Sequence, residues 1–286
     1  MYGACGQMRS DLRIAVSHLP APMAERYLLA TLVGHWRKRG LRVQVGEGYS
    51  PDADVCILHH DISRRDAEKA PPAPRDIPVV NGRVLDISKR SYSTLVLDQD
   101  DAWSGPVIIK SNLNHYGAPE TRMLRRAILE RVRRRLADIS WRGAQSLPSR
   151  SYPILRSIED VPAWAWSSPE LLVEKFLPER TRDGFYGVRG WVFCGDLGYA
   201  YRVASDEPIV KPRTAARITY LKAPPEALMR RRKELKFDYG KFDYVEHDGE
   251  PILLDANKTP TFHGDPESQR MRWLASGIEV FLEGVT

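Results

Sequence analysis

The sequence contains no hydrophobic run long enough to cross a membrane, and it contains few cysteines. No stretch approaches the roughly 18–20 consecutive apolar residues that a spanning helix needs. The N-terminal segment MYGACGQMRSDL has no apolar core of a signal peptide, and Met8 is an alternative start to Met1. The cysteines, 3 in 286 residues, are scattered and odd in number, which argues against a disulfide framework or a cysteine-rich metal site. We therefore expect a cytoplasmic protein with no membrane partner.

Two common signatures of enzymes are missing as well. No GxGxxG motif follows the first apolar segment, which argues against a dinucleotide-binding lobe. We find no Ser/His/Asp or Cys/His set with recognisable spacing, so the histidines are expected in the core or on the surface, with His115 and His263 beside predicted site loops. The net charge of +6 favours anionic partners, a requirement that nucleotides meet as well as nucleic acids do.

The first part of the chain is predicted to be a small α/β unit. Apolar segments alternate with a segment of helical spacing that ends at Gly40. Strands are predicted at Leu12–His18, Leu41–Val45, Asp54–His59 and Ile77–Val80, and a helix at Ala24–Arg39. Because strand, helix and strand in this order require a crossover connection, we expect a parallel sheet.

Two later apolar segments end beside charged residues. Pro106–Lys110 (PVIIK) delivers Lys110 to the polar loop SNLNHYGAPE, where its ammonium and the backbone N–H groups of the loop could hold a phosphate chain. Leu171–Leu177 (LLVEKFL) is a second strand, whose backbone and whose Glu174 could bind the edge of an adenine ring. A solvated surface lysine is the alternative for Lys110, since a strand-terminal lysine alone is a weak signal.

Residues Pro119–Ile139 form the most basic segment of the chain. Apolar residues at helical spacing predict an amphipathic helix whose arginines form a cationic outer face; these apolar residues are Met123, Ala127, Leu129, Val132 and Leu136. A solvated face is the simpler interpretation, and a docking surface for nucleic acid or an acidic partner is the alternative. Nucleic acid is disfavoured because no aromatic platform accompanies the arginines.

Phe237–Thr261 predicts a β-hairpin that carries potential metal ligands. FDYVE alternates apolar and polar residues, Asp248-Gly249 supplies a tight turn, and PILLD leads into Asp255. Asp255 and Asn257 are two residues apart and so point to one face, while Asp243 lies on the partner strand. Oxygen ligands of this kind suit Mg²⁺, which completes its shell with water and phosphate oxygens. The alternative is an edge hairpin with solvated acidic residues.

Val188–Val203 predicts a second hairpin around a Gly-Asp turn. It carries Arg189 and Arg202, and Arg213 follows in the next loop. A planar guanidinium holds a carboxylate with two parallel hydrogen bonds, so we predict that Arg189 in particular holds a carboxylate substrate. The alternative is a set of ordinary surface arginines.

The order of these features resembles that of the ATP-grasp superfamily, of the carboxylate–amine ligase type, and in its motifs that of D-alanine–D-alanine ligases. The resemblance spans Ile77–Thr261, and its strongest parts are VEKFL and GKFDYV followed by ILLDANKTP. Two features depart from the family pattern. The central loop has one glycine, Gly117, where the family loop is glycine-rich, and Asp255 stands where a glutamate is common. The polar residues that could bind phosphate in place of glycine backbone are Asn112, Asn114 and His115.

The resemblance implies an α/β protein with α+β lobes: an ATP-grasp fold preceded by a small parallel α/β domain. It implies an N-terminal domain at residues 1–85, a smaller central lobe at 86–177, and a larger C-terminal lobe with the Mg-binding hairpin at 178–286. The residues implied for nucleotide binding are Lys89, Lys110, Glu174, Lys175, Leu177, Glu179 and Lys211. Those implied for Mg²⁺, with Mn²⁺ as a substitute, are Asp243, Asp255 and Asn257, and those implied for catalysis are Lys241 and Arg189.

The function that the resemblance implies is ATP-dependent ligation, in which a carboxylate is activated as an acyl phosphate and joined to an amine. The implied partners are small-molecule or peptide carboxylates and amines, and a homodimer is left open. One alternative is an ATP-grasp phosphotransferase, which would share every nucleotide residue and differ only in its products. The other is a non-enzymatic binder that uses the basic helix at residues 119–139, for which binding would depend steeply on salt.

Overall fold

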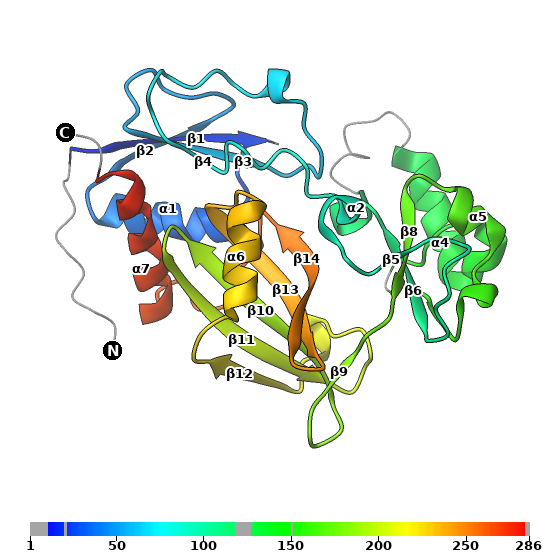
Figure 1. The fold of residues 1–286 in the computed structure, drawn as a ribbon. Coiled ribbons are helices and arrows are strands. Elements are labelled where there is room, and N and C mark those ends of the chain that lie inside the picture. The colour runs from blue at the N-terminus through cyan, green and yellow to red at the C-terminus, as the bar shows by residue number, and fades with distance from the viewer. Residues whose placement is uncertain (1–10, 20–21, 118–126, 150, 284–286) are drawn as a thin grey trace.

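Three sheets form the framework of the protein. The computed structural model describes residues 11–19, 22–117, 127–149 and 151–283. In this part of the chain a four-stranded parallel sheet, a four-stranded central sheet and a six-stranded antiparallel sheet lie side by side (Figure 1). A mixed α/β architecture with a small parallel sheet before the antiparallel lobes was predicted from the sequence, and it is confirmed.

The parallel sheet comes from the first part of the chain. Its strands are β1 (Arg13–Leu19), β2 (Arg42–Gly46), β3 (Val55–His60) and β4 (Val79–Val80), in the order β2-β1-β3-β4. The crossover helix α1 (Leu28–Lys38) follows β1 and packs its apolar stripe on one face of the sheet. Every residue of β3 is buried, as expected for a central strand of a parallel sheet covered on both faces.

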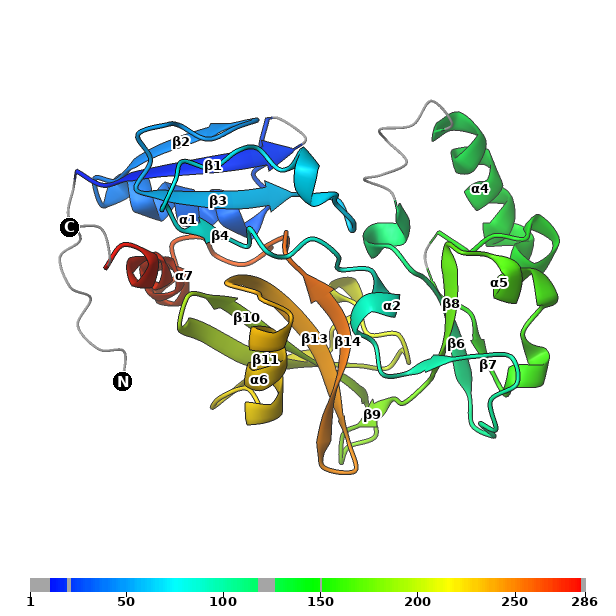
Figure 2. The same ribbon diagram turned by 45° about the horizontal axis from the view of Figure 1, so that its top comes forward.

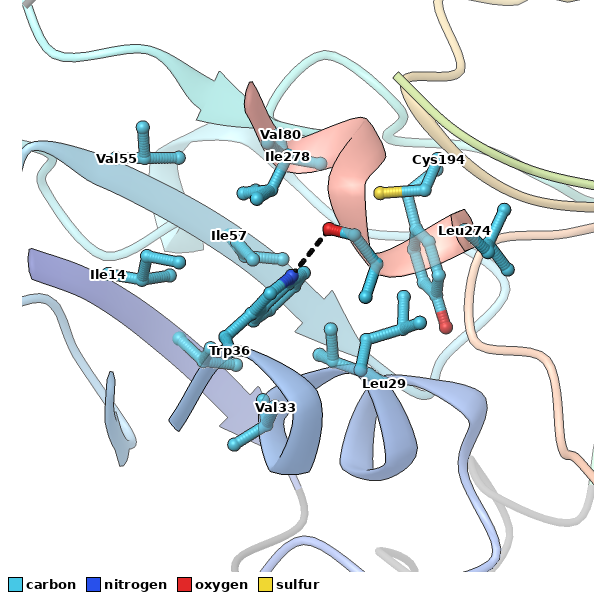
Figure 3. Close-up of a cluster of buried hydrophobic side chains, with 14 of the residues drawn as sticks. Ile14, Leu29, Val33, Trp36, Val55, Ile57, Val80, Cys194, Leu274 and Ile278 are labelled. Atoms are coloured by element: carbon cyan, nitrogen blue, oxygen red, sulfur yellow. Dashed lines mark hydrogen bonds between the residues drawn. The ribbon is translucent and has the colours of Figure 1, made fainter. Parts of the chain in front are cut away.

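The core under α1 is shared with the end of the chain. Figure 3 shows Ile14 and Ile57 of the parallel sheet meeting Trp36 of α1 and Leu274 of α7 (Gln269–Ala275). The indole N–H of Trp36 donates to the carbonyl oxygen of Ala275 at 2.8 Å. The first and last parts of the chain are therefore one packed unit, in which α7 is followed directly by the 3₁₀ helix η5 (Ser276–Phe281).

The central sheet forms a separate lobe, to the right in both views (Figures 1 and 2). Its strands are β5 (Val96–Leu97), β6 (Val107–Ser111), β7 (Ile154–Leu155) and β8 (Leu171–Lys175), in the order β5-β8-β6-β7. The helices of this region are α2 (Lys89–Tyr92), α4 (Ala127–Ala144) and α5 (Ala163–Ser167). Short 3₁₀ helices elsewhere are η1 (Ala67–Lys69), η2 (Asn114–Gly117), η3 (Ile158–Asp160) and η4 (Pro212–Thr214).

The arginine-rich segment is helical where it is described, but its orientation differs from the prediction. Val132 and Leu136 are 53% and 54% exposed, so the prediction that they face a core is wrong. Ala137 is buried instead and Trp141 packs against the core of the lobe. Helical periodicity identifies an apolar face but not the element that covers it. Here the helix contacts the lobe through the face that carries Ala137 and Trp141. Met123 lies outside the described residues.

The antiparallel sheet carries most of the C-terminal region. Its strands are β9 (Glu179–Arg180), β10 (Tyr186–Cys194), β11 (Leu197–Ser205), β12 (Arg217–Leu221), β13 (Tyr239–His247) and β14 (Glu250–Asn257). The order is β12-β11-β10-β13-β14, with β9 paired to β10. Helix α6 (Glu226–Glu234) covers one face, over a core that includes Phe193 and Phe242 (Figure 2). The opposite face packs on α1 and α7 around Cys194, and no helix in the described ranges is long and apolar enough to cross a membrane.

Candidate functional site

The predicted metal hairpin is formed by β13 and β14, and its turn is confirmed. Asp248-Gly249 has φ angles of 51° and 82°, the left-handed pair that a two-residue Asp-Gly turn requires. Across the strands Asp243 pairs with Asp255, and Lys241 pairs with Asn257. Directly paired residues point to the same face of a sheet, so the register brings the four side chains together.

Lys241 and Asp243 form an ion pair on this face, with Lys241 Nζ 2.9 Å from Asp243 Oδ1. Burial lowers the pKa of Lys241, but Asp243 and Tyr201 outweigh it and hold the pKa above its usual value, so the ammonium is charged. Burial raises the pKa of Asp243, Lys241 opposes this rise, and Asp255 adds to it. The two carboxylates thus repel each other on one face, which a bound cation would relieve.

Lys89, at the start of α2, reaches the same hairpin. Its Nζ lies 3.2 Å from Asp255 Oδ1, and it donates to Asn114 Oδ1 at 3.4 Å. Tyr92, one helical turn later, donates its hydroxyl to Asp255 Oδ1 at 3.4 Å and accepts from the Ala256 N–H at 3.2 Å. Burial, with a further contribution from Asp255, raises the pKa of Tyr92 well above its usual value, so this hydroxyl stays a donor.

Lys110 on β6 and Glu174 on β8 form a buried ion pair. Lys110 Nζ lies 2.6 Å from Glu174 Oε2, and the residues are 8% and 0% exposed. The other carboxylate oxygen of Glu174 has no hydrogen-bond partner among the described residues. An orphaned buried acceptor is a site that a ligand donor, such as an exocyclic amine, would satisfy. Lys175, the next residue, holds its ammonium 5.0 Å from the ring centre of Trp103.

Glu179 and Arg189 are bound to each other. Arg189 Nε donates to both oxygens of Glu179, at 3.0 and 2.9 Å, and Arg189 Nη1 donates to Glu246 at 2.5 Å. In the register of β10 and β13 it is Gly190 that pairs with Asp243. Because successive residues of a strand point to opposite faces, Arg189 lies on the face away from Asp243. The guanidinium of Arg189 binds two carboxylates of the protein, those of Glu179 and Glu246. The contact of Arg189 with a substrate carboxylate stays a prediction.

The donors of the hairpin fit a hard cation that shares its shell with phosphates. The described residues contain no cluster of three or more His, Cys, Asp or Glu side chains arranged to hold a metal. Asp243, Asp255 and Asn257 supply two carboxylates and one amide oxygen on a single face. Mg²⁺ is bound in many phosphate-handling sites by one or two carboxylates, with water and phosphate oxygens completing the octahedron. The donor set therefore suits Mg²⁺ together with a nucleotide.

Comparison with solved structures identifies the architecture. A RimK domain protein of the ATP-grasp type from Sphaerobacter thermophilus aligns with 95% of this chain and 100% of its own, at 14% identity and a TM-score of 0.50. The D-alanine–D-alanine ligase from Bacillus anthracis complexed with ATP aligns with 95% of this chain and 98% of its own, at 13% identity and a TM-score of 0.50. The chain has an ATP-grasp fold. The superfamily resemblance predicted from VEKFL and ILLDAN is confirmed at the level of the fold.

No protein-family model matches the sequence, and no curated protein matches it either. At 10–14% identity the structural likeness is a likeness of fold, so the roles of individual residues have to be argued from this chain. The predicted limits of the three regions, 1–85, 86–177 and 178–286, stay a prediction.

Two residues predicted to bind nucleotide, Leu177 and Lys211, lie outside the group of ion pairs described above. Leu177 follows the end of β8, and Lys211 lies in the loop between β11 and β12. Burial lowers the pKa of Lys211, neighbouring Arg213 lowers it further, and Glu207 opposes the change. A lysine with a lowered pKa in a loop beside the sheet remains a candidate to approach a phosphate.

The sequence did not predict a chain of hydrogen bonds that ties the parallel sheet to the hairpin. Asp61, directly after β3, accepts from the Tyr27 hydroxyl at 2.6 Å and from Thr259 Oγ1 at 2.9 Å. The N–H of Thr259 donates to Asn257 Oδ1 at 2.8 Å. The only sequence signal is that Asp61 follows a strand that begins with the apolar run Val55–Leu58, since strand ends of parallel sheets gather functional side chains. Its partner lies 198 residues away, which no local pattern reveals.

Proposed function

We propose that this ATP-grasp chain is an ATP- and Mg²⁺-dependent ligase, which activates a carboxylate as an acyl phosphate and joins it to an amine. The observation that carries the proposal is the charged Lys241 beside Asp243, on the face that also bears Asp255 and Asn257. A ligase needs a fixed cation next to its metal site because the carbonyl oxygen gains negative charge when the amine attacks.

The phosphates of ATP would lie between the hairpin and two buried lysines. Lys89 already contacts Asp255, so its ammonium would neutralise phosphate charge beside the proposed metal ligands. Lys110 is held by Glu174 on the central sheet and would contact phosphates farther from the hairpin. Asp243, Asp255 and Asn257 would hold Mg²⁺, and the metal would supply positive charge to the phosphates.

The nucleoside would bind along the end of β8. Glu174 has a free carboxylate oxygen for the adenine amine, and the backbone of Lys175 and Leu177 would meet the ring edge. Glu179 would accept from ribose hydroxyls, and Arg189 acts as a positioning residue that fixes this carboxylate. Lys211 would approach the γ-phosphate from its loop.

Lys241 would perform the chemistry that distinguishes a ligase. Its ammonium stays protonated at neutral pH, and Tyr201 and Asp243 hold it on the metal-bearing face. A fixed ammonium stabilises the oxyanion of a tetrahedral intermediate without first reorganising water. A phosphotransferase has no tetrahedral carbon intermediate, so it gains less from a cation at this position.

The test is ADP and phosphate release from ATP, measured with a panel of carboxylates and amines and with mass spectrometry of the products. We expect amide formation with stoichiometric ADP, and a hydroxamate when hydroxylamine replaces the amine. Asp255→Asn, which removes a charge but keeps the shape, should abolish turnover while circular dichroism stays unchanged. Phosphorylated alcohols without amides would identify a phosphotransferase instead, and equal turnover in excess chelator would exclude the metal assignment.

A further inference from the structure

A row of side chains crosses the metal-bearing face of the antiparallel sheet. From β14 to β12 the register reads Asp255, Asp243, Gly190, Tyr201 and Tyr220, each paired with the next. Directly paired residues share a face, so the two tyrosines lie on the same face as the two carboxylates. This face continues to β12, the last strand of the sheet.

Gly190, in the middle of this row, lets Tyr201 lie across the sheet. A Cβ atom at position 190 would be 2.4 Å from Cζ and 2.6 Å from the hydroxyl of Tyr201. The hydroxyl of Tyr201 hydrogen-bonds with Lys241, which connects the aromatic side of the row to the ion pair with Asp243. The tyrosines and the proposed catalytic lysine thus line one continuous surface.

The guanidinium of Arg270, on α7, lies over this aromatic surface. Its guanidinium carbon is 3.5 Å from the ring centre of Tyr220 and 5.1 Å from that of Tyr199, and the Tyr199 and Tyr201 rings are 6.2 Å apart. No carboxylate in the described ranges lies within ion-pair distance of Arg270, in contrast to Arg189. A guanidinium stacked on rings keeps its N–H groups at its edge, where they match the two oxygens of a carboxylate.

The outer end of the surface is open. Tyr220 is 54% exposed and Ile218, which precedes it on the same face of β12, is 55% exposed. Exposed apolar side chains beside an unpaired guanidinium favour a ligand with apolar groups next to a negative charge. We call Tyr199, Tyr201, Tyr220 and Arg270 the tyrosine–arginine surface.

We propose that the tyrosine–arginine surface binds a carboxylate at the far end of an elongated, peptide-like substrate, whose reacting end lies at Lys241; this inference rests on the proposed ligase function. Three strand spacings separate Asp243 from Tyr220, which corresponds to about 14 Å at roughly 4.8 Å per strand. An extended peptide covers this length with about four residues at roughly 3.3 Å each. A single amino acid is too short to occupy both ends.

The experiment compares tetrapeptides that carry a C-terminal carboxylate with the same peptides as C-terminal amides, and with free glutamate. Binding is measured by calorimetry on the full chain, and turnover by ADP release. We expect the acid peptides to bind at least tenfold more tightly than the amides, and free glutamate not to bind measurably. Arg270→Gln should remove the preference for the acid peptides while leaving the KM for ATP unchanged. Arg270→Lys should keep only part of this preference, because lysine retains the charge but loses the two parallel N–H donors of the guanidinium.

Arg272→Gln, on the same helix and exposed, is the matched control and should behave as wild type. Arg270→Gln with an undiminished preference for acid peptides, or wild-type protein that binds no acid peptide better than its amide, would overturn the inference. Either result with amide synthesis intact would leave the ligase function standing. Arg270-dependent peptide binding without turnover of ATP would support the surface and count against the ligase function.

Discussion

The buried pair of Lys110 and Glu174 permits a quantitative prediction about stability. Both residues are almost fully buried, and their charged atoms are 2.6 Å apart. Replacing Lys110 by Met keeps most of the side-chain volume but leaves a carboxylate in the interior without its cation. Removing one partner of a buried ion pair costs about 3–5 kcal/mol, because the remaining charge stays desolvated. We expect Lys110→Met to lower the free energy of unfolding by this amount.

The assay is urea unfolding followed by tryptophan fluorescence at neutral pH, without nucleotide. The variant Lys110→Met/Glu174→Leu removes both charges and should recover most of the loss, since an apolar pair of similar volume is often as stable as the ion pair. Lys38→Met is the matched control: Lys38 pairs with Glu267 on the surface, where an ion pair contributes about 0–1 kcal/mol. An unfolding free energy of Lys110→Met within about 1 kcal/mol of that of Lys38→Met would refute the argument.

Two further predictions concern catalysis and pH. Gly190→Ala should push the Tyr201 ring off the sheet and break its hydrogen bond to Lys241. We expect kcat to fall about tenfold, which corresponds to a loss of about 1.4 kcal/mol of transition-state stabilisation, and the KM for ATP to stay unchanged. Tyr201→Phe should have the same effect, and an unchanged kcat in both variants would contradict the role of Tyr201. Burial lowers the pKa of His60 to about 3 and that of His59 well below its usual value. The unfolded chain therefore binds more protons than the folded chain below about pH 6.5. As the pH falls, the free energy of unfolding decreases by up to about 1.4 kcal/mol per pH unit for each of these histidines. His59→Phe should make urea midpoints between pH 7.5 and 5 less pH-dependent, and an unchanged dependence would show that His59 does not contribute.

The parts of the fold that the sequence predicted are those set by short-range chemistry. Asp248-Gly249 predicts its own turn because only a few residues tolerate the left-handed backbone found there. The spacing of Asp255 and Asn257 fixes their shared face for any extended chain, and the structure agrees. Lys89 came from the resemblance in motif order and Asp255 from the hairpin pattern, and their contact at 3.2 Å is consistent with both.

The parts that the sequence did not predict depend on register between distant strands. Val188–Val203 was predicted as a hairpin, but which of its residues faces Asp243 is decided by pairing with β13. A shift of one residue exchanges the two faces, and the observed register aligns Gly190 rather than Arg189 with Asp243. Strand β12 was missed altogether, although Ile218 and Tyr220 alternate with Arg217 and Thr219. The segment is only five residues long and mostly exposed, so no buried face distinguishes it from a surface loop. Without β12 the tyrosine–arginine surface cannot be predicted.

The link through Asp61 positions Asn257, one of the proposed metal ligands. Asn257 is the last residue of β14, where a strand ordinarily frays, and its amide oxygen must point toward the two carboxylates to serve a cation. Thr259 holds that oxygen from one side, and Asp61 holds Thr259 from the parallel sheet. Asp61 also accepts a hydrogen bond from the buried Tyr27, the residue directly before α1. The orientation of the amide is therefore linked to the packing of the parallel sheet, and we expect changes in that packing to reach the proposed metal site.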